Sequence, residues 1–288
     1  MQKGRRLLMI MLILVLLAVF FYLENNLIEI TNQEIRSSKL PKAFDGYTIV
    51  HLSDLHNKSF GREQRNLIEK IQKLNPNMIA ITGDLIDRRR YNEDPAMVLI
   101  QGAVKIAPTY YVTGNHELWS GKFGDFEIRL RNSGVHVLRD KYETIEKENQ
   151  LLHILGVDDT AKYGRSYGEN EERLSLFSEA LKQMTHEINE EEFKILLAHR
   201  PEKMPIYTDE KVDLVLSGHV HGGQIRMPFL GGIVAPDQGV FPKYAEGVYR
   251  DRSTTMVVSR GLGNSIFPQR LFNRPEIVVI KLQREEGK

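Results

Sequence analysis

The sequence predicts an α/β domain behind an N-terminal transmembrane helix. From about residue 47 onward, apolar runs of strand length alternate with amphipathic helical stretches, a pattern typical of layered α/β domains. Before this region, an uncharged apolar segment extends from Leu7 to Leu23. The composition is that of a globular domain, because 41% of the 288 residues are hydrophobic and 27% are charged.

The segment from Leu7 to Leu23 is predicted to be a membrane anchor. Its length falls at the short end of the roughly 17 to 25 residues that a spanning helix needs. It is longer than the roughly 7 to 15 apolar residues of a signal peptide. The residues that follow, Glu24 to Asn26, do not resemble a cleavage site of small residues. The sequence therefore favours an uncleaved anchor over a removed signal peptide.

Charges on either side of the anchor predict its orientation. Lys3, Arg5 and Arg6 precede it, whereas the first basic residue after it is Arg36. Positive residues next to a spanning segment stay on the cytoplasmic side. We therefore expect a single-pass protein of the cell membrane, with a cytoplasmic N-terminus and an extracytoplasmic domain.

The elements expected after the anchor alternate regularly. In the first half we predict strands at 47–52, 78–82, 109–113, 135–138 and 151–157, and helices at 66–74, 95–106 and 123–132. In the second half we predict a helix at 171–185 and strands at 193–198, 212–216, 254–259 and 276–282. We divide the chain into a basic N-terminal region and anchor (1–26), a connector with a first strand (27–45) and one large domain (46–288).

The amino-acid composition excludes every type of site that needs cysteine. The chain has no cysteine, so it can form no disulfide, thiolate nucleophile or cysteine-bound zinc site. A metal ion would have to use histidine, carboxylate and amide ligands. The net charge of +1 gives no reason to expect a nucleic-acid partner. The sequence leaves the oligomeric state open.

Polar residues of metal-ligand type follow one predicted strand after another. Because parallel strands end at one edge of a sheet, residues far apart in sequence can meet there. In chain order the residues are Asp54 and His56; Asp84 and Asp87; Asn115, His116 and Glu117; His199 and Arg200; and His219 and His221.

Each fragment alone has an ordinary explanation. A histidine pair such as His219 and His221 can lie in a solvated loop, and His199 can be a hydrogen-bonded core residue. Asp87 can cap a helix after a turn. The ordered set of fragments at successive strand ends favours a single shared site.

The motifs DLH, GDLID, GNHE, AH and GHVH, in this order, resemble those of the calcineurin-like metallophosphoesterase superfamily. The similarity covers residues 47 to about 224. The anchor, the segment 34–56 and the segment 217–225 further resemble the membrane-anchored YkuE/YaeI-type branch. The resemblance implies a four-layer α/β/β/α sandwich with a dinuclear metal centre at the strand ends, so that 46–288 would be the catalytic domain.

The resemblance also implies a ligand set. One metal would be held by Asp54, His56, Asp84 and His221. Asp84 would bridge to a second metal, which Asn115, His199 and His219 complete. Two divalent ions about 3.5 to 4 Å apart repel strongly, and a shared carboxylate offsets this repulsion. Imidazole, carboxylate and amide ligands suit manganese or iron first and zinc next.

The implied reaction is phosphoester hydrolysis by a metal-bridging hydroxide. His116 would stabilise the transition state or protonate the leaving oxygen. Asp87 could orient His116 or serve only as a helix cap. Arg200 could contact phosphate oxygens or point outward.

We expect a phosphodiesterase that acts on a lipid-linked or membrane-proximal substrate. The anchor concentrates the enzyme near lipids, and the apolar segments 227–236 and 240–244 could form a rim for them. The alternatives are a surface phosphomonoesterase or nucleotidase for soluble substrates, and a metal-binding scaffold without activity. Arg260, Arg270 and Arg274 could contact a phosphate or a headgroup, but we expect them to be solvated.

Overall fold

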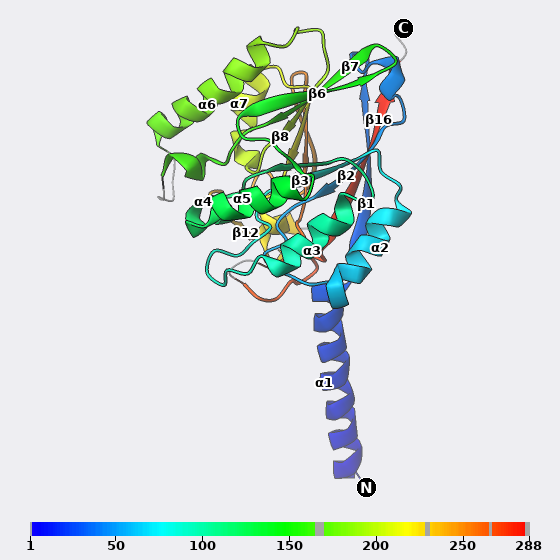
Figure 1. Cartoon of the computed structure of the whole chain (residues 1–288). Helices are drawn as coiled ribbons and strands as arrows, with labels where there is room; N and C mark the ends of the chain where they lie inside the picture. Colours follow the sequence, from blue (N-terminus) through cyan, green and yellow to red (C-terminus); the bar gives the residue numbers. More distant parts are fainter. Residues whose placement is uncertain (1, 165–169, 228–230, 265–266, 286–288) are drawn as a thin grey trace.

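Two six-stranded sheets packed face to face form the centre of the domain. The computed structural model describes residues 2–164, 170–227, 231–264 and 267–285. Helices cover the outer face of each sheet, and the N-terminal helix projects away from the domain (Figure 1).

The first sheet has the strand order β1-β16-β2-β3-β4-β5. Strands β2 to β5 are parallel to one another, so their carboxyl ends share one edge. The last strand of the chain lies between the first two, parallel to β1 and antiparallel to β2. The strands are β1 (Glu29–Ser37), β2 (Thr48–Leu52), β3 (Met78–Thr82), β4 (Thr109–Val112), β5 (His136–Val137) and β16 (Glu276–Arg284).

The second sheet has the order β14-β15-β9-β8-β7-β6. Its four inner strands are parallel, and the two outer strands are antiparallel to their neighbours. The strands are β6 (Lys141–Lys147), β7 (Gln150–Gly156), β8 (Lys194–Leu197), β9 (Leu214–Ser217), β14 (Gly247–Asp251) and β15 (Thr254–Val258).

Alternate residues along the strands contribute to different core layers. In β3, Ile79 and Ile81 pack beneath the helices, whereas Met78 and Ala80 face the second sheet. Because both faces of the inner strands are covered, these strands consist mostly of apolar residues. The helices over the first sheet are α2 (Arg65–Lys73), α3 (Asp94–Ala103) and α5 (Phe123–Asn132). Those over the second are α6 (Glu171–His186) and α7 (Met204–Asp209), with α4 (Asn115–Ser120) near the sheet edge. The expected four-layer sandwich is confirmed.

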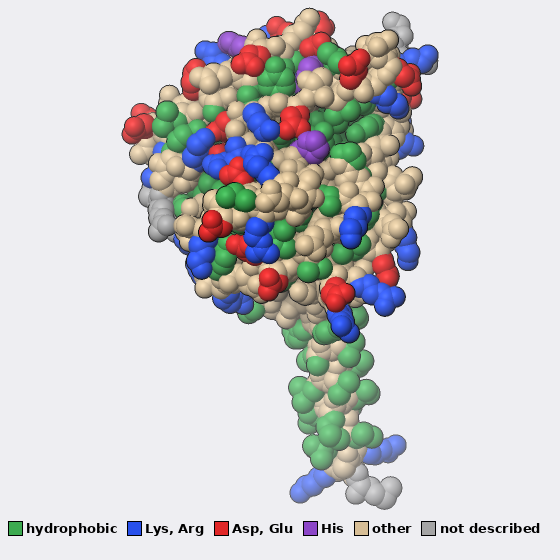
Figure 2. All heavy atoms as spheres, viewed as in Figure 1, with side chains coloured by type: hydrophobic (Ala, Val, Ile, Leu, Met, Phe, Trp, Pro, Cys, Tyr) green, Lys and Arg blue, Asp and Glu red, His purple; other side chains and the backbone are tan. Residues whose placement is uncertain are grey.

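Helix α1 (Gln2–Asn26) is long and apolar enough to cross a membrane. Its apolar side chains are exposed along its length, and basic side chains gather at its free end (Figure 2). At the other end the buried Glu24 accepts a hydrogen bond from the backbone N–H of Asn273 and pairs with Arg274. The helix therefore joins the domain through direct contacts.

Four short strands lie between β9 and β14: β10 (Arg226–Met227), β11 (Gly231–Gly232), β12 (Val234–Ala235) and β13 (Gly239–Val240). Met227, Val234, Val240 and Phe241 are exposed there. They belong to the apolar segments for which we expected a rim, of which residues 228–230 lie outside the described residues.

Candidate metal centre

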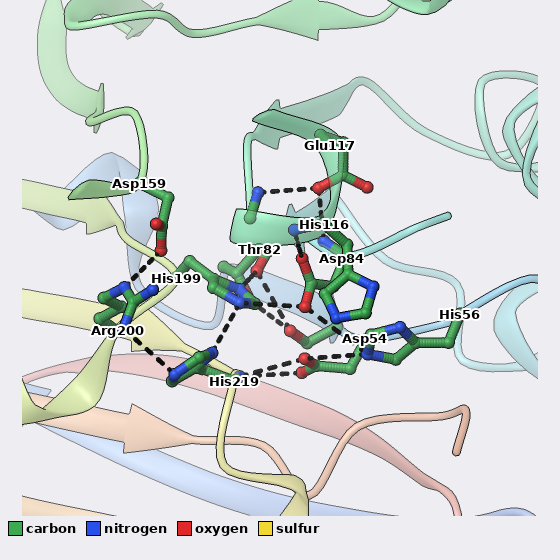
Figure 3. Close-up of polar contacts among 12 residues, drawn as sticks. Asp54, His56, Thr82, Asp84, His116, Glu117, Asp159, His199, Arg200 and His219 are labelled. Atoms are coloured by element: carbon green, nitrogen blue, oxygen red, sulfur yellow. Dashed lines mark hydrogen bonds and ion pairs between the residues drawn. The ribbon is translucent and has the colours of Figure 1, made fainter. Parts of the chain in front are cut away.

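The candidate site is formed by the loops that follow five strands, β2, β3, β4, β8 and β9. These loops meet at the edge of the sandwich where the parallel strands of both sheets end (Figure 3). The backbone N–H groups of Asp54 and His56 donate to the carbonyl groups of Gly83 and Asp84, both at 3.0 Å. In the second sheet the N–H of Gly218 donates to the carbonyl of His199, also at 3.0 Å. Within each sheet, backbone hydrogen bonds therefore hold neighbouring loops together.

Glycine is required where these loops touch. A Cβ atom on Gly218 would lie 1.8 Å from Ser53 Oγ and 2.4 Å from the carboxylate of Asp54. On Gly114, a Cβ would lie 2.2 Å from Asp84 Oδ1. These glycines allow one loop to rest directly against the side chains of another.

Several of the site residues have left-handed backbone conformations. Asp54, His56, Asp84, His219 and His221 have φ values from 46° to 72°. Such conformations cost roughly 1 to 3 kcal/mol each and persist where surrounding contacts enforce them, most often at functional sites. These five candidate ligand residues are therefore held in strained conformations by their surroundings.

A first group of ligand-type side chains consists of Asp54, His56 and His221. The Nε2 atoms of the two histidines lie 3.1 Å apart. Asp54 Oδ1 lies 3.5 Å from the Nε2 of His221 and 3.9 Å from that of His56. All three residues are buried.

A second group consists of Asp84, His199 and His219. His219 Nδ1 lies 3.1 Å from His199 Nε2, which in turn lies 3.4 Å from Asp84 Oδ2. The other nitrogen of His199 contacts the carbonyl oxygen of Thr82 at 2.7 Å, which fixes the orientation of the ring.

Asp84 connects the two groups. Its Oδ2 atom lies 3.6 Å from His56 Nε2 in the first group and 3.4 Å from His199 Nε2 in the second. Its Oδ1 atom accepts a hydrogen bond of 2.8 Å from the backbone N–H of His116. One carboxylate oxygen is thereby available to both groups.

The donor set fits divalent cations. Among the described residues, the buried Oδ1 atom of Asn115 has no hydrogen-bond partner. Burial, reinforced by His116, lowers the pKa of His56 to about 3, and burial also lowers the pKa of His221. Both rings are therefore neutral and have a lone pair for a metal. Burial opposes charge on His199 as well, but Asp84 and Asp54 outweigh it and raise the pKa of His199 to about 10. The same carboxylates would attract a metal cation.

His116 lies at the border of the first group. A ring nitrogen of His116 lies within 4.8 Å of ligand atoms of His56 and Asp84, and its ring meets that of His56 edge to face at 4.5 Å. The backbone N–H of Arg88 donates to His116 Nδ1 at 3.2 Å. The proton of a neutral His116 ring is thereby assigned to Nε2.

Asp87 organises its own turn. Its Oδ1 atom accepts hydrogen bonds from the backbone N–H groups of Arg89 and Arg90 and lies 3.9 Å from His116 Nδ1. The same turn positions the backbone N–H of Arg88, which donates a hydrogen bond to His116. Asp87 therefore acts on His116 mainly through the shape of this loop.

Glu117 has a structural position that sequence patterns did not reveal. Its fully buried carboxylate accepts hydrogen bonds from the backbone N–H groups of Asp84 and Gly114 at 2.8 Å and of Ile86 at 3.1 Å. It therefore ties the loop after β3 to the loop after β4. Burial, together with the charge of Asp84, raises the pKa of Glu117 to about 7.

Arg200 neither points outward nor presents a free charge to phosphate. It is buried, its Nε donates to Asp159 at 2.7 Å, and its Nη1 contacts Asp237 and Glu202. Asp237 Oδ2 also contacts His219 Nε2 at 3.0 Å. Sequence reasoning missed Asp159 and Asp237, neither of which belongs to a recognisable motif.

The arginines near the C-terminus also differ from expectation. Arg260 and Arg270 are buried, so the expectation that they are solvated is wrong for both. Arg260 pairs with Glu276, and Arg270 donates to the carbonyl oxygens of Gly263 and Asn273. Arg274 pairs with Glu24 of α1. All three arginines form contacts that hold the loop before β16, although the side chain of Arg274 remains 38% exposed.

Comparison with known proteins gives one family match and several relatives. Residues 47–223 match the calcineurin-like phosphoesterase family. The chain is 34% identical over 270 residues to a protein of Bacillus subtilis described as uncharacterized metallophosphoesterase YkuE, covering 91% of this chain and 88% of that protein. It is 31% identical over 281 residues to an uncharacterized metallophosphoesterase of Aquifex aeolicus, covering 95% and 98%.

A relative from Danio rerio is described as a transmembrane protein with metallophosphoesterase domain. It is 29% identical over 267 residues, which make up 89% of this chain and 57% of that protein. Among solved structures, TT1561 of Thermus thermophilus aligns with a TM-score of 0.48 at 16% identity, covering 75% of this chain and 90% of that one.

Proposed function

Because this chain belongs to the calcineurin-like metallophosphoesterase family, we propose that it is a phosphodiesterase that uses two divalent metal ions on a lipid-linked or membrane-proximal substrate. The observation that carries the proposal is the position of Asp84 Oδ2, which lies between His56 of one ligand group and His199 of the other. This is the arrangement that a shared carboxylate between two metals requires.

The site residues would bind metal, donate a proton or position the loops. Asp54, His56 and His221 would hold one metal, His199, His219 and Asn115 would hold the other, and Asp84 would contribute to both sites. When bound, a pair of divalent ions activates water and offsets the charge of the phosphoryl oxygens. His116, whose Nδ1 accepts a hydrogen bond from Arg88, would use its Nε2–H to donate a proton to the leaving oxygen. Glu117 holds the loops of Asp84 and Asn115 in register.

The join between α1 and the domain supports a membrane substrate. The segment that binds the end of α1 also reaches the candidate metal centre. The side chain of Asn273 donates to the carbonyl oxygen of His221 at 2.7 Å, and its backbone N–H donates to Glu24. The basic residues at the free end of α1 favour a cytoplasmic N-terminus. The substrate would then lie at the extracytoplasmic surface of the membrane.

The proposal is tested with the full-length protein in detergent, purified without chelator. We expect about two metal ions per chain by elemental analysis, manganese or iron before zinc. We also expect faster hydrolysis of bis-p-nitrophenyl phosphate than of p-nitrophenyl phosphate. Asp84→Asn should lose metal and abolish both activities.

The alternatives predict different results. A surface phosphomonoesterase or nucleotidase would prefer p-nitrophenyl phosphate or soluble nucleotides. Bound metal without turnover of any phosphoester would instead indicate a scaffold. Absence of stoichiometric metal from a folded protein would refute the dinuclear centre itself.

A further inference from the structure

A cavity of about 460 Å³ lies between the end of α1 and the candidate metal centre. The residues that line it come from α1, from the loops after β2 and β3, and from the loop before β16. They are Asn25, Asn26, His56, Asn57, Lys58, Arg90, Asn92, Asn264 and Pro268. The cavity thus touches a proposed metal ligand at one end and the membrane helix at the other.

The lining of the cavity is suited to an anion. It contains the basic side chains of Lys58 and Arg90, several amide side chains and no acidic residue. Lys58 Nζ donates to the backbone carbonyl of Asn25, and no carboxylate of the described residues forms a salt bridge with it. Arg90 pairs with Asp87 at 3.2 Å, yet its side chain is 72% exposed. Ammonium, guanidinium and amide groups are the usual donors to phosphate oxygens.

The position of the cavity brings it close to the membrane surface. Asn25 and Asn26 end α1, immediately after the apolar segment that closes at Leu23. Exposed aromatic residues gather at the same junction, where Phe272 packs against Phe20 of α1 with ring centres 5.6 Å apart. Aromatic side chains are enriched at membrane interfaces.

We propose that this cavity binds the phosphate-bearing headgroup of a lipid whose tails stay in the membrane. The headgroup would enter beside Asn25 and contact Lys58 and Arg90, and its phosphoester would then reach the metal centre past His56. This inference rests on the proposed function and adds the residues that recognise the substrate.

Direct binding is the first test, because it does not depend on turnover. The full-length protein in detergent is mixed with phosphatidic acid or phosphatidylcholine, and bound lipid is counted by native mass spectrometry. We expect a clear preference for phosphatidic acid, weakened about tenfold by Lys58→Gln and by Arg90→Gln, since a charged hydrogen bond is lost. Glutamine at position 58 can still donate to the Asn25 carbonyl, so the junction with α1 is kept.

Matched controls remove the same charge outside the cavity. Lys73→Gln on α2 and Arg89→Gln beside Arg90 both change exposed residues and should bind phosphatidic acid like the unchanged protein. Lys58→Arg, which keeps the positive charge, should restore most of the binding. Equal binding in the cavity variants and in the controls would overturn the proposal.

A kinetic test separates lipid from soluble phosphate. In nanodiscs of phosphatidylcholine, hydrolysis of bis-p-nitrophenyl phosphate is measured with phosphatidic acid in the disc or with glycerol 3-phosphate in solution. We expect inhibition by phosphatidic acid that weakens in the cavity variants, and little inhibition by glycerol 3-phosphate. The lipid assignment would be contradicted if phosphatidic acid and glycerol 3-phosphate inhibited equally strongly and if both inhibitions weakened equally in the Lys58 variant. If the unchanged protein neither hydrolysed the diester nor contained metal, the proposed function would be contradicted. The lipid-binding test would still show whether the cavity binds phosphatidic acid.

Discussion

The two nitrogens of the His219 ring face different partners. Nδ1 faces His199 Nε2 in the candidate metal centre, and Nε2 contacts the carboxylate of Asp237 at 3.0 Å. A carboxylate in this position fixes the tautomer and orientation of a metal-binding histidine and increases its basicity. Asp237 is held in turn by Arg200, and a hydrogen bond from His219 lowers its pKa, so it stays ionised. We therefore assign Asp237 a positioning role.

Asp237→Asn should weaken metal binding by about tenfold to a hundredfold at the site that His219 serves. The reason is that the neutral amide no longer offsets the charge of the bound ion through the imidazole. Elemental analysis after dialysis against graded chelator measures the effect, with the exposed Asp251→Asn as the control. Unchanged retention of both metals would show that Asp237 only supports Arg200.

His116→Ala tests the proton-donor role. Metal content should stay the same, because the proposed ligands do not include His116, while kcat for the diester falls by about 10² to 10⁴. The exposed His186→Ala serves as the control. Loss of metal from the His116 variant would make this residue a ligand and contradict its assignment.

At the scale of the elements, the close contact between the loops after β2 and β9 depends on Gly218. Any side chain there would overlap Ser53 and Asp54, both of which are buried and held by neighbouring strands. Because neither residue has space to move into, the loop that carries His219 and His221 would have to shift.

Gly218→Ala should therefore lower the free energy of unfolding by about 1 to 3 kcal/mol, the usual cost of overpacking, and should also reduce metal binding. Urea titration and elemental analysis measure the two effects. Gly124→Ala in α5 is the control, because its Cβ would meet nothing within 4 Å and alanine favours the helix. A Gly218 variant as stable and as metal-rich as the control would contradict the packing argument.

The sequence predicted most inner strands and long helices because their residues carry a strong pattern. The run 78–82 is apolar except for Thr82 and forms β3 at the predicted residues, since helices and the second sheet cover both of its faces. Two strands that were missed, β6 and β14, are the edges of the second sheet. They are only partly buried, so their sequences contain many charged residues and lack the apolar signal.

The residues of the candidate site could be predicted where they directly follow a strand with a clear apolar pattern. Asp54, Asp84, Asn115, His199 and His219 follow apolar runs closely, and the structure brings all of these loops together. Asp159 contacts Arg200, and Asp237 contacts both Arg200 and His219. Their partners are far apart in sequence, so no local pattern could reveal them.

At the scale of the whole molecule, the first sheet is closed by the last strand. Strand β16 pairs with β1 on one side and β2 on the other, and it buries Ile277, Val278, Ile280 and Leu282. Without β16, β1 has no partner strand in the sheet and an apolar groove opens beside β2.

A chain that ends at Arg274 should therefore fail to form the folded domain, whereas a chain that ends at Glu285 keeps every strand and should fold. Limited proteolysis and circular dichroism of the detergent-purified chains distinguish the two outcomes. A protease-resistant domain in the shorter chain would show that β16 is dispensable.

The place of β16 also sets an order of events during synthesis. β1 is synthesised long before β16, yet in the described sheet β16 is the strand that pairs with β1, so β1 must wait for it. Such non-local pairing is slow because a long loop must close first. While the residues between β1 and β16 are being made, the first sheet therefore has an open seam between β1 and β2, and this seam closes only after β16 has been synthesised.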